Sequence, residues 1–144
     1  MEHTDKAIKT LKGLIFILQL STASYQAASE DVEDPLIKES IMVYFRERSF
    51  YLLQLQHEMK KLGQPYNDDW EEYLKERDWS LKSAFCLNTF LLSCIEMEQK
   101  LILKYKLSLQ EIKFYSALSL LLQNQLLGIE KSLIQITKYQ QSLN

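Results

Sequence analysis

Residues 34–65 read DPLIKESIMVYFRERSFYLLQLQHEMKKLGQP and predict one long amphipathic helix with a defined start and a defined end. Asp34 is a good N-cap and Pro35 suits the first helical position, so the helix should begin at Pro35. Gly63, with Pro65 close behind it, supplies the C-terminal stop. Between these signals, mostly apolar residues recur at steps of three and four, which is the spacing of one buried helix face. That face passes through Ile37, Ile41, Tyr44, Arg48, Leu52, Leu55, Met59 and Leu62.

Three more stretches show the same helical periodicity. The first should run over about residues 5–29, and the last should begin at Ser108, because Ser108 and Glu111 match a capping box. Over residues 67–105 the apolar pattern continues without a strong breaker, so this region is either one long helix or two.

The composition favours the same all-α interpretation. The chain of 144 residues has only 3 Gly and 2 Pro against 47% hydrophobic and 25% charged residues, which leaves few turn formers and favours long helices. Four amphipathic helices with short connections predict a four-helix bundle. The length fits a single domain that covers residues 1–144.

Charge and hydropathy disfavour several classes of protein. The formal net charge of -2 offers no basic face to nucleic acid. No stretch approaches the ~20 uninterrupted apolar residues that cross a bilayer, so we expect no integral membrane segment. Residues 12–24 superficially resemble a signal peptide, but Glu2 and Asp5 occupy positions where positive charge is expected. Cys86 and Cys94 would lie about 12 Å apart on one helix, too far for a disulfide, so both should stay reduced, as in the cytoplasm.

A set of short motifs is spread along nearly the whole chain. They are residues 24–28 (SYQAA), residues 32–35 (VEDP), Leu55 with residues 60–65 (KKLGQP), Trp79, Cys94, Glu98 and Tyr105. Together they resemble a ferritin-like family of bacterial bundle proteins that carries no assigned function. The resemblance implies a crossover segment around Trp79, between the second helix and a separate third core helix. With that crossover the second and third helices run parallel; without it they form an antiparallel hairpin.

The resemblance also raises the question of metal. The wider ferritin-like superfamily builds a dinuclear site from one Glu on each of two helices and a Glu-x-x-His on each of the other two. This chain contains no Glu-x-x-His, and the nearest approach is residues 54–57 (QLQH), where an amide replaces the carboxylate. Hydrolase and transferase motifs are also missing from a chain with only two His. We therefore expect no metal, no cofactor and no catalytic residues.

Arg48 and Glu98 stand out as charged residues on otherwise apolar stripes. A buried carboxylate costs several kcal/mol unless it is paired, so Glu98 needs a partner or an exit to water. Counting equal rises from the starts of two parallel helices brings Arg48 to about the level of Glu98. The parallel topology therefore predicts a buried Arg48–Glu98 ion pair in the space that a metal centre would fill. The antiparallel topology would instead leave the Arg48 guanidinium to reach water at the end of a packed stem.

A second apolar stripe predicts a partner. Leu14 and Ile17 lie off the main core line of the first helix, while Leu120, Leu127 and Ile134 repeat at intervals of seven on the last. A helix that is apolar over more than one face either lies deep in a core or buries the extra face against another molecule. We expect a homodimer that forms through the first and last helices.

Three functions remain open at this point. The sequence favours a non-enzymatic ferritin-like bundle without the di-metal site, acting through protein–protein contacts or as a structural or stress-related bundle. The first alternative is a di-iron or di-manganese metalloprotein, which the family topology permits and the ligand inventory opposes. The second alternative is a carrier of an apolar acyl ligand, in which the helices part to leave a cavity.

Overall fold

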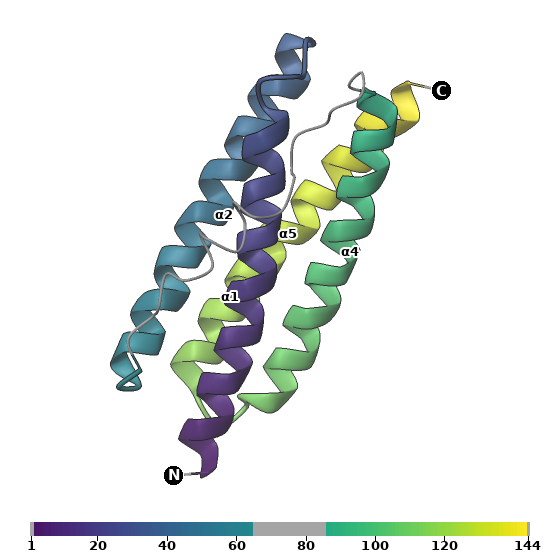
Figure 1. Cartoon of the computed structure of the whole chain (residues 1–144). Helices are drawn as coiled ribbons and strands as arrows, with labels where there is room; N and C mark the ends of the chain where they lie inside the picture. Colours follow the sequence, from purple (N-terminus) through teal and green to yellow (C-terminus); the bar gives the residue numbers. More distant parts are fainter. Residues whose placement is uncertain (1, 65–85, 144) are drawn as a thin grey trace.

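The computed structural model describes residues 2–64 and 86–143, and within them it contains four long α-helices and no strand. The helices are α1 (Glu2–Ala28), α2 (Pro35–Lys61), α4 (Leu87–Glu111) and α5 (Ser116–Ser142). They pack side by side as a four-helix bundle (Figure 1), which confirms the predicted all-α bundle. None of these four helices is both long and apolar enough to cross a bilayer.

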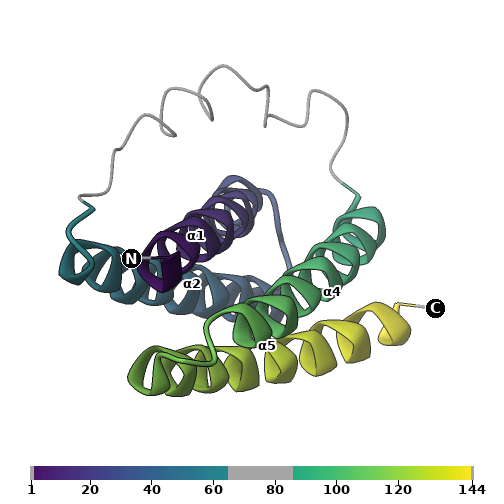
Figure 2. The ribbon, with the colours of Figure 1, turned by 90° about the horizontal axis from the view of Figure 1, so that it is seen from below.

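The order of the helices around the bundle decides which of them can meet at its centre. α1 packs against α2 and α4, and α4 packs against α5, whereas α2 and α5 pack least closely among the neighbouring pairs. The view along the bundle in Figure 2 shows the resulting ring, in which α1 is diagonal to α5 and α2 is diagonal to α4. Side chains of α2 and α4 can therefore meet only across the core.

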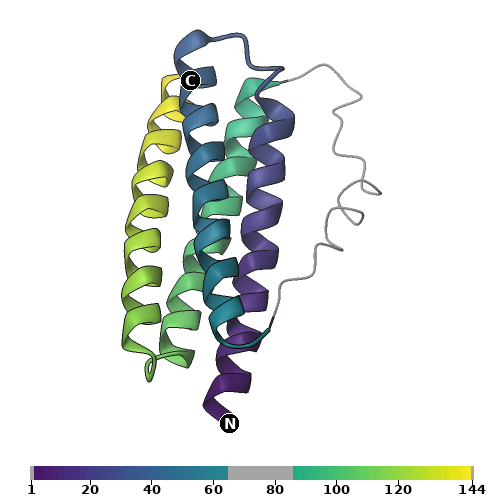
Figure 3. The same ribbon diagram turned by 90° about the vertical axis from the view of Figure 1, so that its left-hand side faces the viewer.

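α2 and α4 run in the same direction. α2 ends with Lys61 at one end of the bundle, and α4 begins with Leu87 at the other end (Figures 1 and 3). This is the parallel arrangement that the family resemblance implied, and it excludes the antiparallel hairpin. One continuous helix over residues 67–105 is also excluded, because the backbone of Cys86 is extended, with φ −116° and ψ 111°. The crossover helix expected around Trp79 lies outside the described residues.

The ends of α2 are those that the sequence predicts. The Asp34 carboxylate accepts hydrogen bonds from the backbone amides of Leu36 and Ile37 at 2.9 and 3.2 Å. These bonds satisfy two of the amides that a helix start leaves unpaired. Gly63 has a φ of +82°, a left-handed conformation that glycine adopts without strain, and the chain leaves the helix there.

The predicted start of the last helix at Ser108 is wrong. α4 continues to Glu111, and α5 begins at Ser116. The Ser108 hydroxyl is buried and donates to the Lys104 carbonyl at 2.7 Å within α4, while Glu111 accepts a 2.6 Å hydrogen bond from the Thr10 hydroxyl of α1. The pattern fails as a cap because Ser108 lies on the buried face of α4, where packing against the bundle continues the helix.

Two clusters of buried apolar side chains fill the bundle, with polar side chains between them. The first cluster is built from Ala7, Leu11, Leu14, Ile15, Leu18, Leu52, Leu55, Met59, Leu101, Tyr105, Ile112, Leu118, Leu122, Leu126 and Ile129. The second is built from Tyr25, Val32, Ile37, Ile41, Tyr44, Leu91, Cys94 and Ile136. All four helices contribute to both clusters. To the buried residues of the second cluster, α1 contributes only Tyr25 and α5 contributes only Ile136.

The α1 part of the predicted dimer face is wrong. Leu14 is fully buried in the first core cluster. Ile17 is half-buried and lies with Met97 of α4 in a shallow hollow between α1 and α4. α1 is apolar over a wide face because it packs against two neighbours, α2 and α4. Since α1 is also diagonal to α5, residues of these two helices do not form one outer surface.

Two glycines lie inside helices, where glycine is normally unfavourable. At Gly128 in α5, an added Cβ would collide with the Tyr51 hydroxyl of α2 and lie 3.2 Å from the Tyr51 Cζ. At Gly13 in α1, an added Cβ would meet only the end of the Lys104 side chain, at 3.0 and 3.1 Å. Glycine is therefore needed at position 128 for the close approach of Tyr51, and no comparable need exists at position 13.

We predict opposite effects for alanine at these two glycines. Gly13→Ala should stabilise the protein by up to ~1 kcal/mol, because Lys104 can move aside and alanine favours the helix. Gly128→Ala should instead destabilise it by ~1–3 kcal/mol through overpacking against Tyr51. Urea unfolding of both variants measures the difference. In a Tyr51→Ala background Gly128→Ala should lose its penalty, and a penalty that persists there would show that Tyr51 is not its cause.

Candidate functional site

A charged pair lies buried at the centre of the bundle. Arg48 comes from α2 and Glu98 from α4, and neither side chain has exposed surface. Arg48 Nη2 donates to Glu98 Oε2 at 2.7 Å. Because α2 and α4 are diagonal and parallel, the pair crosses the core at one level. The structure thus brings together the two charged residues that the sequence analysis paired.

Tyr25 of α1 supplies the second hydrogen bond to the Glu98 carboxylate. Its hydroxyl is buried and donates to Glu98 Oε1 at 2.6 Å. Each oxygen of Glu98 therefore accepts from a different helix, one from a guanidinium and one from a hydroxyl. Hydrogen bonds to a charged group are about twice as strong as neutral ones, so the two donors offset much of the cost of burying this carboxylate.

Glu47 extends the cluster to the edge of the bundle between α2 and α5. Arg48 Nη1 donates to Glu47 Oε1, and the Ser132 hydroxyl of α5 lies 3.5 Å from the same oxygen. The Glu47 side chain is 31% exposed, so this outer carboxylate meets water while the inner pair does not. Arg48 Nε is buried and has no hydrogen-bond partner among the described residues. The cluster thus joins side chains of all four helices.

The cluster also sets the protonation of its neighbours. Burial alone would lower the pKa of Arg48. The Glu98 carboxylate opposes that effect most strongly, with further help from Tyr25 and Glu47, and the net shift of the Arg48 pKa is upward. Burial, followed by the Glu98 charge, raises the pKa of Tyr25 well above its usual value and also raises the pKa of Cys94. At neutral pH Arg48 is therefore a cation, and Tyr25 and Cys94 keep their protons.

A second polar layer crosses the bundle nearer the turn between α4 and α5. The Tyr105 hydroxyl of α4 donates to Gln125 Oε1 of α5 at 2.6 Å, and Gln125 Nε2 donates to Gln54 Oε1 of α2 at 3.0 Å. Tyr105 and Gln125 are both buried. Tyr105 is one of the motif residues named above, whereas Gln125 was not predicted; its position beside Leu126 on the buried face of α5 was the available signal.

The donors around Glu98 do not fit a dinuclear metal centre. Such a centre needs several carboxylates and imidazoles that converge on one point. Here both Glu98 oxygens accept hydrogen bonds, and a guanidinium cation lies against the carboxylate. Residues 2–64 and 86–143 hold no group of three or more His, Cys, Asp or Glu side chains that could bind a metal ion. His57 is exposed on α2, away from the cluster of buried charges.

Large apolar side chains remain exposed on α2 and α5. On α5 they are Leu120, Leu127 and Ile134, each 58% exposed, and these are the residues that the sequence analysis assigned to a dimer face. The sequence analysis missed Leu36, Val43 and Phe50 of α2, which are also exposed. The sequence did contain an indication of this surface, because Leu36, Val43 and Phe50 also repeat at intervals of seven residues. We refer to these six residues as the outer stripes.

A groove of about 660 Å³ lies between α2 and α5, where the bundle is least closely packed. Its walls carry apolar, hydroxyl and charged side chains together. The lining residues are Val43, Tyr44, Glu47, Gly128, Lys131, Ser132, Ile134, Gln135, Lys138 and Tyr139. Since Glu47 is one of them, the groove reaches the outer edge of the buried cluster.

Comparison with known proteins identifies the fold. No family model and no curated protein matches the chain. Among solved structures, the chain is similar to Dps92 from Deinococcus radiodurans, with a TM-score of 0.79 over 96% of this chain and 88% of that chain. The two sequences are 14% identical, so the similarity concerns the fold. It confirms the expected ferritin-like four-helix bundle.

We predict that replacing Arg48 alone is more damaging than replacing it together with Glu98. Arg48→Met leaves the Glu98 carboxylate buried with only the Tyr25 hydroxyl, which should cost ~3–5 kcal/mol of unfolding free energy. In the Arg48→Met/Glu98→Met double variant no unpaired charge is buried, so much of that loss should be recovered. Urea unfolding of the wild type, both single variants and the double variant measures the coupling.

The control for this cycle is the exposed Lys61–Glu58 pair at the end of α2. Lys61→Met should change the unfolding free energy by less than ~1 kcal/mol, because water screens exposed ion pairs. A double variant at Arg48 and Glu98 whose loss equals the sum of the two single losses would contradict the coupling.

We also predict that the protein unfolds in alkali. Burial is the main cause that raises the pKa of Tyr25 and of Tyr105 in the folded protein. An unfolded tyrosine ionises near pH 10, so the stability that these protonated side chains contribute is fully present below about pH 10 and is lost as the pH rises further. Tyrosinate absorbance and circular dichroism should therefore change together above about pH 10. Tyr105→Phe should weaken this pH dependence, and complete tyrosine ionisation with unchanged helicity would contradict the prediction.

Proposed function

We propose that this protein is a non-enzymatic, ferritin-like helical bundle that lacks the di-metal site and works through protein–protein contacts as a homo-oligomer. One observation carries the proposal. The buried centre of the bundle is occupied by the Arg48–Glu98 pair and the Tyr25 hydroxyl, where the superfamily places converging metal ligands. The cation beside the Glu98 carboxylate is therefore the Arg48 guanidinium.

Electrostatics supports the metal-free part of the proposal. A bound divalent ion would have to displace the Arg48 guanidinium from both Glu98 and Glu47, and the guanidinium has no exposed surface through which to leave. Arg48 already balances part of the charge of Glu98 and Glu47, so less than the full charge of the two carboxylates remains to compensate a metal ion. The one histidine whose side chain the structure describes, His57, is exposed, so no described imidazole lies beside the pair.

The chemistry of the buried reactive side chains supports the non-enzymatic part. The Cys94 thiol lies in the core, and burial together with the Glu98 charge raises its pKa, which makes it a poor nucleophile at neutral pH. The hydroxyls of Tyr25 and Tyr105 already donate buried hydrogen bonds, to Glu98 and Gln125 respectively. A carrier of an acyl chain is a poorer match than a contact protein, because the groove between α2 and α5 is open and lined by charged and hydroxyl side chains as well as apolar ones.

The surface supports a role in protein contacts. The outer stripes of α2 and α5 keep six large apolar side chains about half exposed, on the two helices that pack least closely against each other. Single exposed apolar residues are ordinary, but two regular rows on neighbouring helices are the pattern of an interaction surface.

Metal analysis tests the proposed function. We predict that protein purified without chelator, and then incubated with Fe²⁺ or Mn²⁺ and desalted, holds less than ~0.1 metal ion per chain, because the central carboxylates are already paired. Its thermal unfolding midpoint should not rise when the ions are added. Glu98→Gln is the matched control, since it removes the central carboxylate. Stoichiometric metal in the wild type that is lost in Glu98→Gln would overturn the proposal.

A further inference from the structure

The two outer stripes form one surface because α2 and α5 lie in a fixed antiparallel register. Tyr44 of α2 hydrogen-bonds to Gln135 of α5. Their neighbours in sequence, Val43 and Ile134, both line the groove between the helices. The apolar side chains therefore border the two sides of a common groove at this level.

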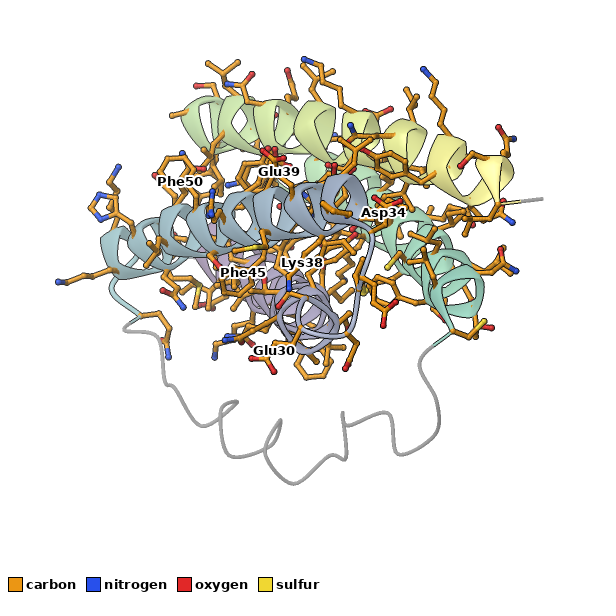
Figure 4. All side chains as sticks on the ribbon, turned by 90° about the horizontal axis from the view of Figure 1, so that it is seen from above. Glu30, Asp34, Lys38, Glu39, Phe45 and Phe50 are labelled. Carbon is orange, nitrogen blue, oxygen red and sulfur yellow. The ribbon has the colours of Figure 1, made fainter. Side chains whose placement is uncertain are left out.

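The same arrangement recurs two helical turns away. Tyr51 of α2 lies against Gly128 of α5. The residues just before them, Phe50 and Leu127, are both more than half exposed. Figure 4 shows Phe50 projecting from α2 on the side that faces α5. At two successive levels, then, each helix presents one large apolar side chain to the outside of the groove.

This surface carries both a protruding side chain and a hollow. A two-fold interface uses the same patch on both copies, so a side chain that protrudes from the patch must find its hollow on the same patch of the partner. Phe50 is the protrusion, with 57% of its surface exposed, and the groove of about 660 Å³ beside Gly128 is the hollow. A large aromatic side chain that enters a pocket is the usual energetic centre of an interface.

The charges of the surface also suit contact with a second copy. Glu47 lies on the α2 wall of the groove, and Lys131 and Lys138 lie on the α5 wall. A patch that carries both signs can face its own copy with opposite charges aligned. A strongly acidic or basic patch could not, because like charges would meet.

The exposed apolar area is comparable to the apolar area that one partner buries in a standard interface. At roughly 80 Å² for each half-exposed large side chain, the six residues of the outer stripes provide on the order of 500 Å² per chain. A standard interface buries ~800 Å² per partner, of which a little over half is apolar. The apolar surface available on α2 and α5 therefore matches what one partner contributes to a specific complex.

We infer that the surface formed by the outer stripes of α2 and α5 is a dimerisation surface for a second copy of this chain, with Phe50 of each copy seated in the α2–α5 groove of the other. The inference rests on the proposed function, because it names the partner and the surface of the contacts proposed there. It moves the dimer face predicted from the sequence away from α1 and onto α2 and α5.

Light scattering after size exclusion of the full chain tests the inference. The wild type should give twice the chain mass of 17.0 kDa. Leu127→Glu and Ile134→Glu should each give the chain mass itself, because a carboxylate buried in an apolar contact should raise the dissociation constant at least ~100-fold. Phe50→Ala should raise it at least ~10-fold by removing the side chain that fills the groove. Circular dichroism should show unchanged helicity in all three, since these side chains are solvent-exposed within one chain.

Phe16→Glu is the matched control. Phe16 is also a large exposed apolar residue, but it lies on α1, diagonal to α5, so this variant should remain dimeric. A monomeric wild type at about 100 µM would overturn both the inference and the homo-oligomeric part of the proposed function. A dimer that survives Leu127→Glu and Ile134→Glu, or that Phe16→Glu dissociates, would overturn only the surface. Bound metal would overturn the proposed function without bearing on the surface.

Discussion

The buried Arg48–Glu98 hydrogen bond is the constraint on which the rest of this bundle depends, because it joins the two helices that do not otherwise meet. α2 and α4 are diagonal, so their relation is set across the core instead of by direct packing. A shift of either helix by one turn, about 5.4 Å, would separate the two charges inside the protein. An unpaired buried charge costs several kcal/mol, so such a shift is strongly disfavoured. The pair therefore selects both the parallel direction and the register of α2 and α4.

The apolar clusters and the polar layers contribute differently to the fold: the first supply free energy, and the second fix the register of the helices. Apolar burial supplies most of the free energy, but it is non-directional and tolerates sliding of one helix along another. Hydrogen bonds tolerate such sliding much less. The bonds among Tyr105, Gln125 and Gln54 fix the relative positions of α4, α5 and α2 along the bundle axis. This matters most between α2 and α5, where close packing is least extensive and hydrogen-bonded side chains hold the register.

The sequence predicted the features that depend on local signals or on one dominant energy term. The Asp34 cap and the Gly63 stop follow from backbone chemistry, and Arg48 could be matched to Glu98 because few partners can satisfy a buried charge. The predictions that failed concern features that depend on tertiary packing. Ser108 has the pattern of a cap but lies on a buried helix face, and Leu14 looks like surplus apolar surface only until α1 is seen to have two neighbours. The part played by Tyr25 could not be predicted, since its hydroxyl meets Glu98 only when α1 and α4 pack together.

The interior and the surface of the bundle are connected through Glu47. Its carboxylate accepts a hydrogen bond from Arg48 on one side and lines the α2–α5 groove on the other. A second chain that covers the groove would exclude water from this carboxylate, which weakens screening and strengthens its attraction to the guanidinium. The desolvation cost is reduced because Arg48 already donates a hydrogen bond to Glu47. Dimerisation on this surface would therefore tighten the buried cluster.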